Sequence, residues 1–364
     1  MTETSIAPAA PSLHDRDLRG FASDNYAGVH PEVLEAIAAA NGGHQIAYGE
    51  DVYTARLVET LREHFGERAE AFPVFNGTGA NVTALTSVLP RWGAVVCTST
   101  AHIHSDEGGA PEKVAGLKLF TVDTPDGKLT PELVATQAWG FDDEHRAQPA
   151  AVSITQTTEL GTLYTPAEIR AIADTAHEHD MALHLDGARI WNAAAALGVP
   201  FREFTTDAGV DVLSFGGTKN GLLGAEAIVV LNPDRAAGLV RLRKSLMQLS
   251  SKMRFQSAQL LALFDGGLGL ASAAHANAMA ARLRGALDDL VAAGDAPGLS
   301  FSQPTQANAV FAVLPNAAAD RIRERYRFYD WDRAAGQVRW MTAFDTSEAD
   351  VDGFVEAIRE ELAR

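Results

Sequence analysis

The stretch from Thr165 to Asp186, TPAEIRAIADTAHEHDMALHLD, decides the fold class of this chain. Thr165 can cap a helix, Pro166 suits the first helical position, and Glu168 completes a capping box. The helix is expected to run to about Asp180, and the strand MALHLD follows directly. A helix that leads straight into a buried strand is typical of a βαβ unit.

The same alternation of strands and helices extends on both sides of this unit. Helices are expected before it at 31–40, 52–65 and 82–89, and the polar segment 140–149 is expected to be a surface loop. The short apolar runs that we expect to be strands are Ala94–Cys97, Leu117–Val122, Ala151–Thr155, Met181–Leu185, Asp211–Phe215 and Ala225–Leu231. The sequence therefore predicts an α/β fold with a mostly parallel central sheet and helices on both faces.

The character of the sequence changes after Pro233. Helical segments dominate to about Ala292, two strand-like pieces follow at 309–314 and 338–342, and a helix is expected at 347–361. This pattern predicts a smaller C-terminal α+β domain. We expect an N-terminal arm at 1–20, a large domain at 21–245 and a small domain at 246–364, with residues 21–47 able to pack on the small domain.

Composition excludes several classes of protein. The 364 residues are 46% hydrophobic, so a sizeable core can form, and the net charge is −17. Such a charge repels nucleic acid and anionic lipid. The single cysteine, Cys97, cannot form an intrachain disulfide. No apolar run is long enough to cross a bilayer, and the first residues do not resemble a signal peptide, so we expect a cytoplasmic protein.

One lysine lies in an unusual setting. Lys219 stands in SFGGTKNGLLGAE, just after the strand expected at 211–215, between glycines and apolar residues. A poorly solvated lysine has a lowered pKa, and its neutral amine attacks carbonyl groups. The alternative is a lysine at a strand end that reaches water.

Two further features lie where a ligand would bind. Asp186 ends a strand, and the carboxyl ends of strands in open α/β sheets face the ligand crevice. Such a carboxylate can hold a protonated ring nitrogen, although Asp186 could instead pair with Arg189. The turn at 76–81, NGTGAN, opens a helix, and backbone N–H groups at such a turn favour a phosphate.

A histidine cluster allows two interpretations. His102 follows a strand, and an imidazole there can stack on a cofactor ring or move protons. The alternative is a metal site, because His102 and His104 would share one face of an extended chain, and His184 and Asp186 could add ligands. Arg339, in a strand-like stretch, is a candidate for binding a substrate carboxylate. Ser23 belongs to a polar segment near the N-terminus.

The order of these features resembles that of the fold-type I enzymes that use pyridoxal 5′-phosphate (PLP). More narrowly, the sequence is similar to the low-specificity L-threonine aldolase family, a group related to the aromatic amino acid beta-eliminating lyases. The matching stretches cover almost the whole chain: FASDNYAGVHPEV (21–33), YGEDVYT (48–54), NGTGAN (76–81), AHIHSDEGGAPE (101–112), TQTTELGTLY (155–164), LHLDGARIWNA (183–193), LSFGGTKNG (213–221), KMRFQSAQ (252–259) and VRWMTAFDTSEADVD (338–352).

The resemblance implies a role for each matching residue. Lys219 would bind PLP covalently, Asp186 would pair with its ring nitrogen, and His102 would stack on the ring. Further roles fall on residues that would contact the phosphate (Gly77, Thr78, Thr218, and Arg254 from a neighbouring subunit) and on those that would bind the substrate (Ser23, Tyr48, Arg189 and Arg339). Because Arg254 would reach a neighbour, the resemblance implies a homodimer or homotetramer with a shared active site.

The implied reaction is the retro-aldol cleavage of threonine, allo-threonine and related β-hydroxy-α-amino acids, such as phenylserine, to glycine and an aldehyde. Two positions depart from the family pattern. Glu159 stands where many members have a second histidine, and Asp106 replaces a bulky aromatic residue. The base that acts on the β-hydroxyl is therefore either Glu159 or a water held by His102.

Three other functions stay open on the sequence. A β-eliminating lyase or an aminotransferase would use the same lysine and aspartate. A metal-dependent hydrolase would use the histidines, and a non-catalytic binding protein would keep only the fold.

Overall fold

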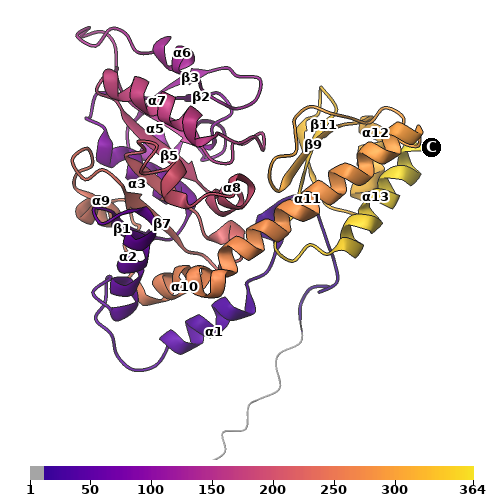
Figure 1. Cartoon of the computed structure of the whole chain (residues 1–364), viewed down its shortest axis with the longest axis horizontal. Coiled ribbons are helices and arrows are strands. Elements are labelled where there is room, and N and C mark those ends of the chain that lie inside the picture. Colours follow the sequence, from indigo (N-terminus) through magenta and orange to yellow (C-terminus); the bar gives the residue numbers. More distant parts are fainter. Residues whose placement is uncertain (1–11) are drawn as a thin grey trace, which may run out of the picture.

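The computed structural model describes residues 12–364, so residues 1–11 of the expected arm lie outside it. A seven-stranded sheet forms the centre of the larger lobe, in the order β1-β7-β6-β5-β4-β2-β3 (Figure 1). Strands β2 to β6 are parallel, whereas β7 and β1 are antiparallel to their neighbours. The strands are β1 (Glu70–Val74), β2 (Gly93–Thr98), β3 (Lys118–Val122), β4 (Gln148–Thr155), β5 (Ala182–Gly187), β6 (Val212–Phe215) and β7 (Glu226–Val230).

Helices cover both faces of this sheet. The apolar core on one face includes residues of α1, α2, α7, α8 and α10, and two smaller clusters on the other face include residues of α3, α4 and α9. The helices of this lobe are α1 (Pro31–Ala40), α2 (Val52–Phe65), α3 (Gly77–Val88), α4 (His102–Ser105), α5 (Ala110–Val114), α6 (Pro131–Ala135), α7 (Pro166–Glu178), α8 (Ile190–Leu197), α9 (Leu239–Ser245) and α10 (Arg254–Phe264), with 3-10 turns η2 (Phe201–Phe204), η3 (Thr218–Asn220) and η4 (Asp265–Gly267).

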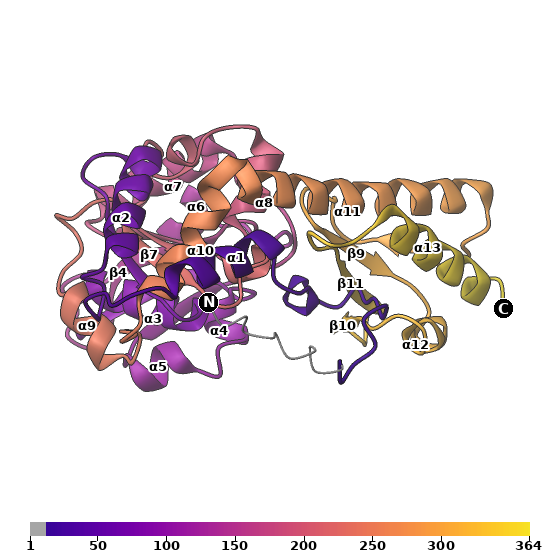
Figure 2. The same ribbon diagram turned by 90° about the horizontal axis from the view of Figure 1, so that it is seen from below.

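The long helix α11 (Leu268–Ala293) runs from the larger lobe to a smaller one (Figure 2). An antiparallel sheet in the order β10-β11-β9-β8 forms the smaller lobe. Its core contains Phe21, Leu283, Trp340 and Phe354. Its remaining elements are β8 (Ser300–Phe301), β9 (Ala309–Val313), α12 (Asn316–Arg323), β10 (Tyr329–Asp332), β11 (Gln337–Met341) and α13 (Glu348–Leu362). The fold class predicted from the sequence is confirmed, and the domain boundaries stay a prediction.

The N-terminal segment connects the two lobes. The backbone oxygen of Phe21 accepts a hydrogen bond from Met341 of β11, at 2.8 Å. The chain then forms the 3-10 turn η1 (Asp24–Tyr26) and enters α1, which packs on the larger lobe. This path carries Asp24 to the junction between the lobes.

The structure corrects two expectations about secondary structure. Strand β1 was not predicted, because Pro73 lies within it, and proline is tolerated only on an edge strand such as this one. The expected loop at 140–149 ends earlier, because β4 begins at Gln148 and accommodates Pro149 beside an irregularity in its pairing with β2. Among residues 12–364, the helices are all too short or too polar to cross a membrane.

Candidate active site

A narrow cavity lies at the carboxyl ends of β4, β5 and β6, where the sequence predicts a ligand crevice. It brings together seven of the residues expected to form the site with five others. The lining residues are Gly77, Thr78, Asn81, His102, Glu107, Thr155, Thr157, Glu159, Asp186, Ala188, Arg189 and Lys219. Residues more than 140 positions apart therefore meet at one edge of the sheet.

Lys219 lies on the short turn η3, directly after β6. The carboxylate of Glu226, on the neighbouring strand β7, accepts the N–H groups of Gly217 at 2.9 Å and Thr218 at 3.3 Å, and so holds the turn in place. Burial lowers the pKa of Lys219, and the nearby positive charge of Arg189 lowers it further. The lysine lines the cavity, as an amine nucleophile requires.

Asp186 does not pair with Arg189, which was the alternative that the sequence left open. One oxygen of Asp186 accepts the backbone N–H of Ala188 at 3.0 Å, and the other accepts the side-chain amide of Asn81 at 2.8 Å. Neutral N–H donors leave the negative charge of Asp186 available to a ligand. The carboxylate of Asp186 is buried, and it lines the same cavity as Lys219.

Arg189 is held by a different acid. Its Nε donates to Asp24 at 2.7 Å and its Nη2 donates to the other oxygen of Asp24 at 2.9 Å. Asn308, from the smaller lobe, donates to Asp24 at 3.1 Å. Burial opposes ionisation of Asp24, but the charge and hydrogen bonds of Arg189 outweigh it and lower the pKa of Asp24. This pair fixes one guanidinium at the wall of the cavity.

Arg339, on β11, approaches the same region from the smaller lobe. Its Nη2 lies 3.5 Å from the backbone oxygen of Ala22, and its buried Nε has no hydrogen-bond partner in the described chain. Burial, together with the charge of Arg189, lowers the pKa of Arg339 to about 10. A buried cation with an unsatisfied donor is suited to bind an anion.

Glu159 is anchored by one oxygen only. Its Oε1 accepts the backbone N–H of His102 at 2.9 Å and the hydroxyl of Thr155 at 2.8 Å. Its Oε2 is buried and has no partner among residues 12–364. Burial raises the pKa of Glu159. The cavity therefore contains a carboxyl group with one oxygen free for a ligand and with a tendency to take up a proton.

Five of the expected residues do not line this cavity. Thr218 directs its N–H toward Glu226, and Ser23 lines a different cavity. Tyr48 is exposed, and a guanidinium nitrogen of Arg254 donates to Gly43 at 3.3 Å. Arg339 lies near Arg189 and Asp24 but does not line the narrow cavity. The roles of these residues stay predictions.

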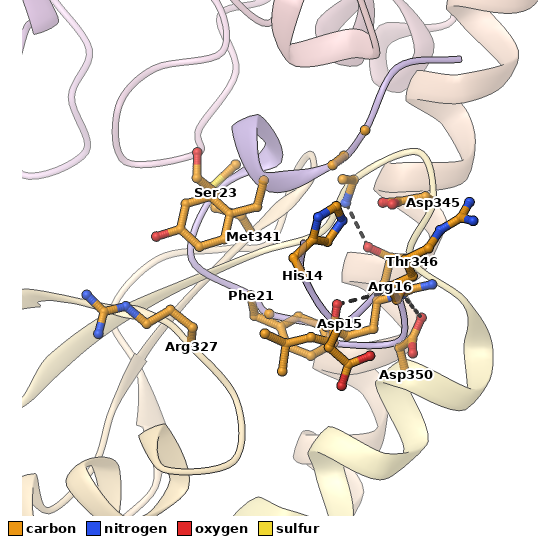
Figure 3. Close-up of a pocket in the computed structure, with 17 residues that line it drawn as sticks. His14, Asp15, Arg16, Phe21, Ser23, Arg327, Met341, Asp345, Thr346 and Asp350 are labelled. Carbon is orange, nitrogen blue, oxygen red and sulfur yellow. Dashed lines mark hydrogen bonds and ion pairs between the residues drawn. The ribbon is translucent and has the colours of Figure 1, made fainter. Parts of the chain in front are cut away.

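The second cavity, of about 720 Å³, lies between the N-terminal segment and the smaller lobe (Figure 3). Its charged groups include both signs, such as Arg19 and Asp350 at 3.7 Å. Neither Lys219 nor Asp186 lines it. We therefore assign the chemistry to the narrower cavity.

The histidines do not converge as a metal site requires. His102 and His104 lie on the short helix α4 and not on an extended chain, so they point in different directions, and His104 is exposed. His184 lies between the hydroxyl groups of Ser153 at 2.9 Å and Ser214 at 3.0 Å, with both ring nitrogens in use. Residues 12–364 contain no group of three side chains placed to hold a metal ion.

Sequence reasoning did not select Asn81, Glu107, Asp24 or Glu226. For Asn81 a signal existed, because it follows Gly77 by four residues on one helix, and such positions share a face. The other three residues, Asp24, Glu107 and Glu226, are acids, and acidic residues usually lie on the surface. Only the fold brings them against the cavity and the lysine turn.

The fold and the cavity define a class of protein: an α/β enzyme in which a lysine and a strand-end carboxylate line one cavity. The beta-eliminating lyase family matches residues 20–314, and the chain belongs to this family.

Named relatives narrow the comparison. The low specificity L-threonine aldolase of Pseudomonas sp. (strain NCIMB 10558) is 43% identical over 93% of this chain and 96% of its own length. That of Pseudomonas aeruginosa is 44% identical over 94% of this chain and 96% of its own. A solved structure of Leishmania major threonine aldolase has a TM-score of 0.88 and 28% identity, and the match covers 94% of this chain and 99% of that one. The family resemblance inferred from the sequence is confirmed.

Proposed function

We propose that this protein uses PLP to cleave L-threonine, L-allo-threonine and related β-hydroxy-α-amino acids, such as phenylserine, to glycine and an aldehyde. The observation that carries the proposal is the meeting of Lys219, Asp186 and His102 in one cavity at the carboxyl edge of the sheet. The names of the two Pseudomonas relatives support the same reaction.

The residues present fit PLP. Helix α3 begins at Gly77, and the first N–H groups of a helix lack partners within it, so Gly77 and Thr78 can donate to the phosphate. Lys219 supplies the amine, and the charge of Asp186 is free to hold the proton on the ring nitrogen. When bound, PLP accepts the electron pair of the breaking Cα–Cβ bond.

Two guanidinium groups would bind the substrate carboxylate. Arg189 is fixed by Asp24, and Arg339 retains an unsatisfied Nε, so the pair offers a held donor and a free one. A carboxylate held in this way would orient Cα and Cβ relative to the cofactor ring, which is an effect of position on rate. Ser23 and Tyr48 are proposed to complete this side of the pocket.

The proton of the β-hydroxyl needs a base. Glu159 is a candidate because its Oε2 has no partner in the described chain and its raised pKa brings it closer to neutral pH. A water held by His102 is the other candidate. Asp106, whose Oδ2 lies 3.7 Å from Nε2 of His102, would border the space for the β-substituent.

We also propose that the protein is a homodimer or homotetramer with shared active sites. Tyr48 donates its backbone N–H to Ser251, and Phe75 donates its own to the side chain of Gln248, so these segments are neighbours. Large apolar side chains on them are exposed, and Tyr48, Phe75 and Met247 are 50%, 41% and 74% exposed. Exposed apolar groups that gather in one region favour a contact between subunits.

The acidic composition and single cysteine support a cytoplasmic location.

The test is to titrate the purified protein with L-allo-threonine and then L-phenylserine, in the presence of PLP, while glycine and aldehyde are assayed in the same tube. Equal amounts of glycine and aldehyde are expected. Ammonia and a keto acid in place of glycine would establish a β-eliminating lyase, which the family name also allows. A protein that stays colourless after incubation with PLP and removal of the unbound cofactor would refute the cofactor.

A further inference from the structure

Four side chains form a continuous chain of hydrogen bonds along the wall of the cavity. Nδ1 of His102 lies 2.9 Å from Oε1 of Glu107. The same oxygen accepts a hydrogen bond from Nδ2 of Asn81 at 2.8 Å, and Nδ2 of Asn81 also donates to Asp186 at 2.8 Å. The chain therefore connects the imidazole with the carboxylate that faces the cofactor ring.

The two side chains in the middle of this chain of hydrogen bonds, Glu107 and Asn81, are buried. Glu107 has no exposed side-chain surface, and Asn81 is 2% exposed. A side-chain amide nitrogen has two hydrogens, and Asn81 uses one for each carboxylate. It thereby lies between two acidic groups that would otherwise repel each other in a poorly solvated place.

The geometry also selects one form of the imidazole. An ionised carboxylate only accepts hydrogen bonds, so Nδ1 of His102 must carry the proton that it shares with Glu107. Nε2 then lies on the other side of the ring, 3.7 Å from Oδ2 of Asp106. A histidine fixed by a carboxylate at one nitrogen can exchange protons at the other.

We propose that Glu107 and Asn81 are positioning residues, which hold His102 with Nδ1 protonated and link its protonation to the charge of Asp186. This inference rests on the proposed function, because it gives His102 an acid–base role in addition to stacking on the cofactor. Neither residue needs to contact the substrate, since both act through His102 and Asp186.

The charged groups around His102 act in both directions. The hydrogen bond that His102 donates to Glu107 raises the pKa of His102 most strongly. Burial lowers this pKa, the charge of Asp186 raises it and that of Lys219 lowers it, and the net result is a raised pKa. Asp106 faces Nε2, and Glu159 accepts the backbone N–H of His102. Glu107 is the group in direct contact with the ring at hydrogen-bond distance, so its replacement should dominate.

The first test follows the His102 signal by NMR in cofactor-free protein labelled at histidine, with His102→Asn used to assign the signal. We expect Glu107→Gln to lower the pKa of His102 by about one unit, since that variant removes a charge at hydrogen-bond distance. The matched control is Glu112→Gln, an exposed glutamate on α5, which should leave the pKa unchanged. An unchanged pKa in Glu107→Gln would overturn the proposal.

The second test uses Asn81→Leu, which keeps the size of the side chain but removes the bridging amide. Glu107 then has one donor fewer, so the pKa of His102 should not fall. A fall like that in Glu107→Gln would show general loosening of the site and would also overturn the proposal. The affinity for PLP, measured by absorbance, should drop about tenfold because Asp186 loses a donor. An unchanged PLP affinity would refute the link to Asp186.

These results are separable from the proposed function. The NMR titration needs no cofactor and no turnover, so it reports on Glu107 and His102 even if the protein does not cleave amino acids. Wild-type protein that binds no PLP would refute the proposed function and leave the pKa comparison intact.

Discussion

The two arginines at and beside the cavity, Arg189 and Arg339, have different hydrogen-bond partners, and the difference predicts different roles. Arg189 has a bidentate partner in Asp24, whereas Arg339 has a single long contact with a backbone oxygen. A guanidinium held by an acid is rigid, and one without such a partner gains most from an incoming carboxylate. The two arginines are therefore expected to contribute unequally to substrate binding.

The first prediction concerns Asp24. Asp24→Asn should weaken the binding of glycine, a carboxylate-bearing product, by about tenfold, since Arg189 loses a charged hydrogen-bond partner. The affinity for PLP should stay within about twofold of wild type, because Asp24 does not line the cofactor cavity. Spectral titrations with glycine and with PLP measure the two affinities. Equal losses in both would contradict the assignment, and Asp17→Asn, at an exposed position, is the control.

The second prediction concerns Glu159. If its carboxylate removes the hydroxyl proton, Glu159→Gln should lower kcat about 100-fold, while the amide keeps the contacts with His102 and Thr155. Binding of glycine, which has no hydroxyl group, should hardly change. Steady-state cleavage of L-allo-threonine measures kcat, and a glycine titration measures the affinity for glycine. A kcat equal to that of wild type would instead favour the water held by His102.

Among the elements, β5 carries a titratable group through the centre of the sheet. His184 is fully buried between Ser153 of β4 and Ser214 of β6. Burial lowers the pKa of His184 from 6.5 to about 4. Below about pH 6.5 the unfolded chain takes up a proton that the folded chain refuses, so this residue makes stability fall with acidity.

The third prediction follows from the loss of stability that His184 causes as the pH falls. Between about pH 6.5 and about pH 4, wild-type protein should lose roughly 3 kcal/mol of unfolding free energy through His184, at ~1.4 kcal/mol for each pKa unit. His184→Asn should show a shallower loss over the same range. Urea unfolding at a series of pH values measures the slopes. Parallel curves for the two proteins would contradict the prediction, and His145→Asn, at an exposed loop position, is the control.

The elements also show where sequence reasoning succeeds. The capping box of α7 and the strand after it lie where TPAEIRAIADTAHEHDMALHLD predicts them, since capping and periodicity are local. Strand β1 escaped prediction because its place depends on pairing with β7, more than 150 residues later. In the site, Lys219 and Asp186 could be found from strand ends, whereas Asp24 meets Arg189 across 165 positions of the chain, a contact that depends on long-range packing.

At the scale of the whole molecule, the proposal of an active site shared between subunits rests on Arg254. Arg254 begins α10 and does not line the cavity of its own chain. Its proposed role at a partner's phosphate requires that α10 lies at the subunit interface. A site made from two chains has a consequence that no single-chain site has, namely complementation between inactive subunits.

The fourth prediction uses that consequence. Lys219→Ala and Arg254→Ala proteins should each have little activity, whereas isolated hybrid dimers should have about half of wild-type activity, since each hybrid has one intact site of two. Mixing is done by co-expression with two affinity tags, and hybrids are isolated through both. Hybrids without activity would contradict a shared site. Dimers of two differently tagged Lys219→Ala chains, prepared in the same way, provide the control.

The position of the cofactor on the chain is the first property to measure, because the proposed chemistry depends on Lys219. The protein is incubated with PLP, reduced with borohydride, digested and mapped by mass spectrometry. We expect the pyridoxyl group on the peptide that contains Lys219, and we expect it to be absent from that peptide when L-allo-threonine is added before reduction. Labelling at another lysine, such as Lys244 or Lys252, or no labelling at all, would contradict it.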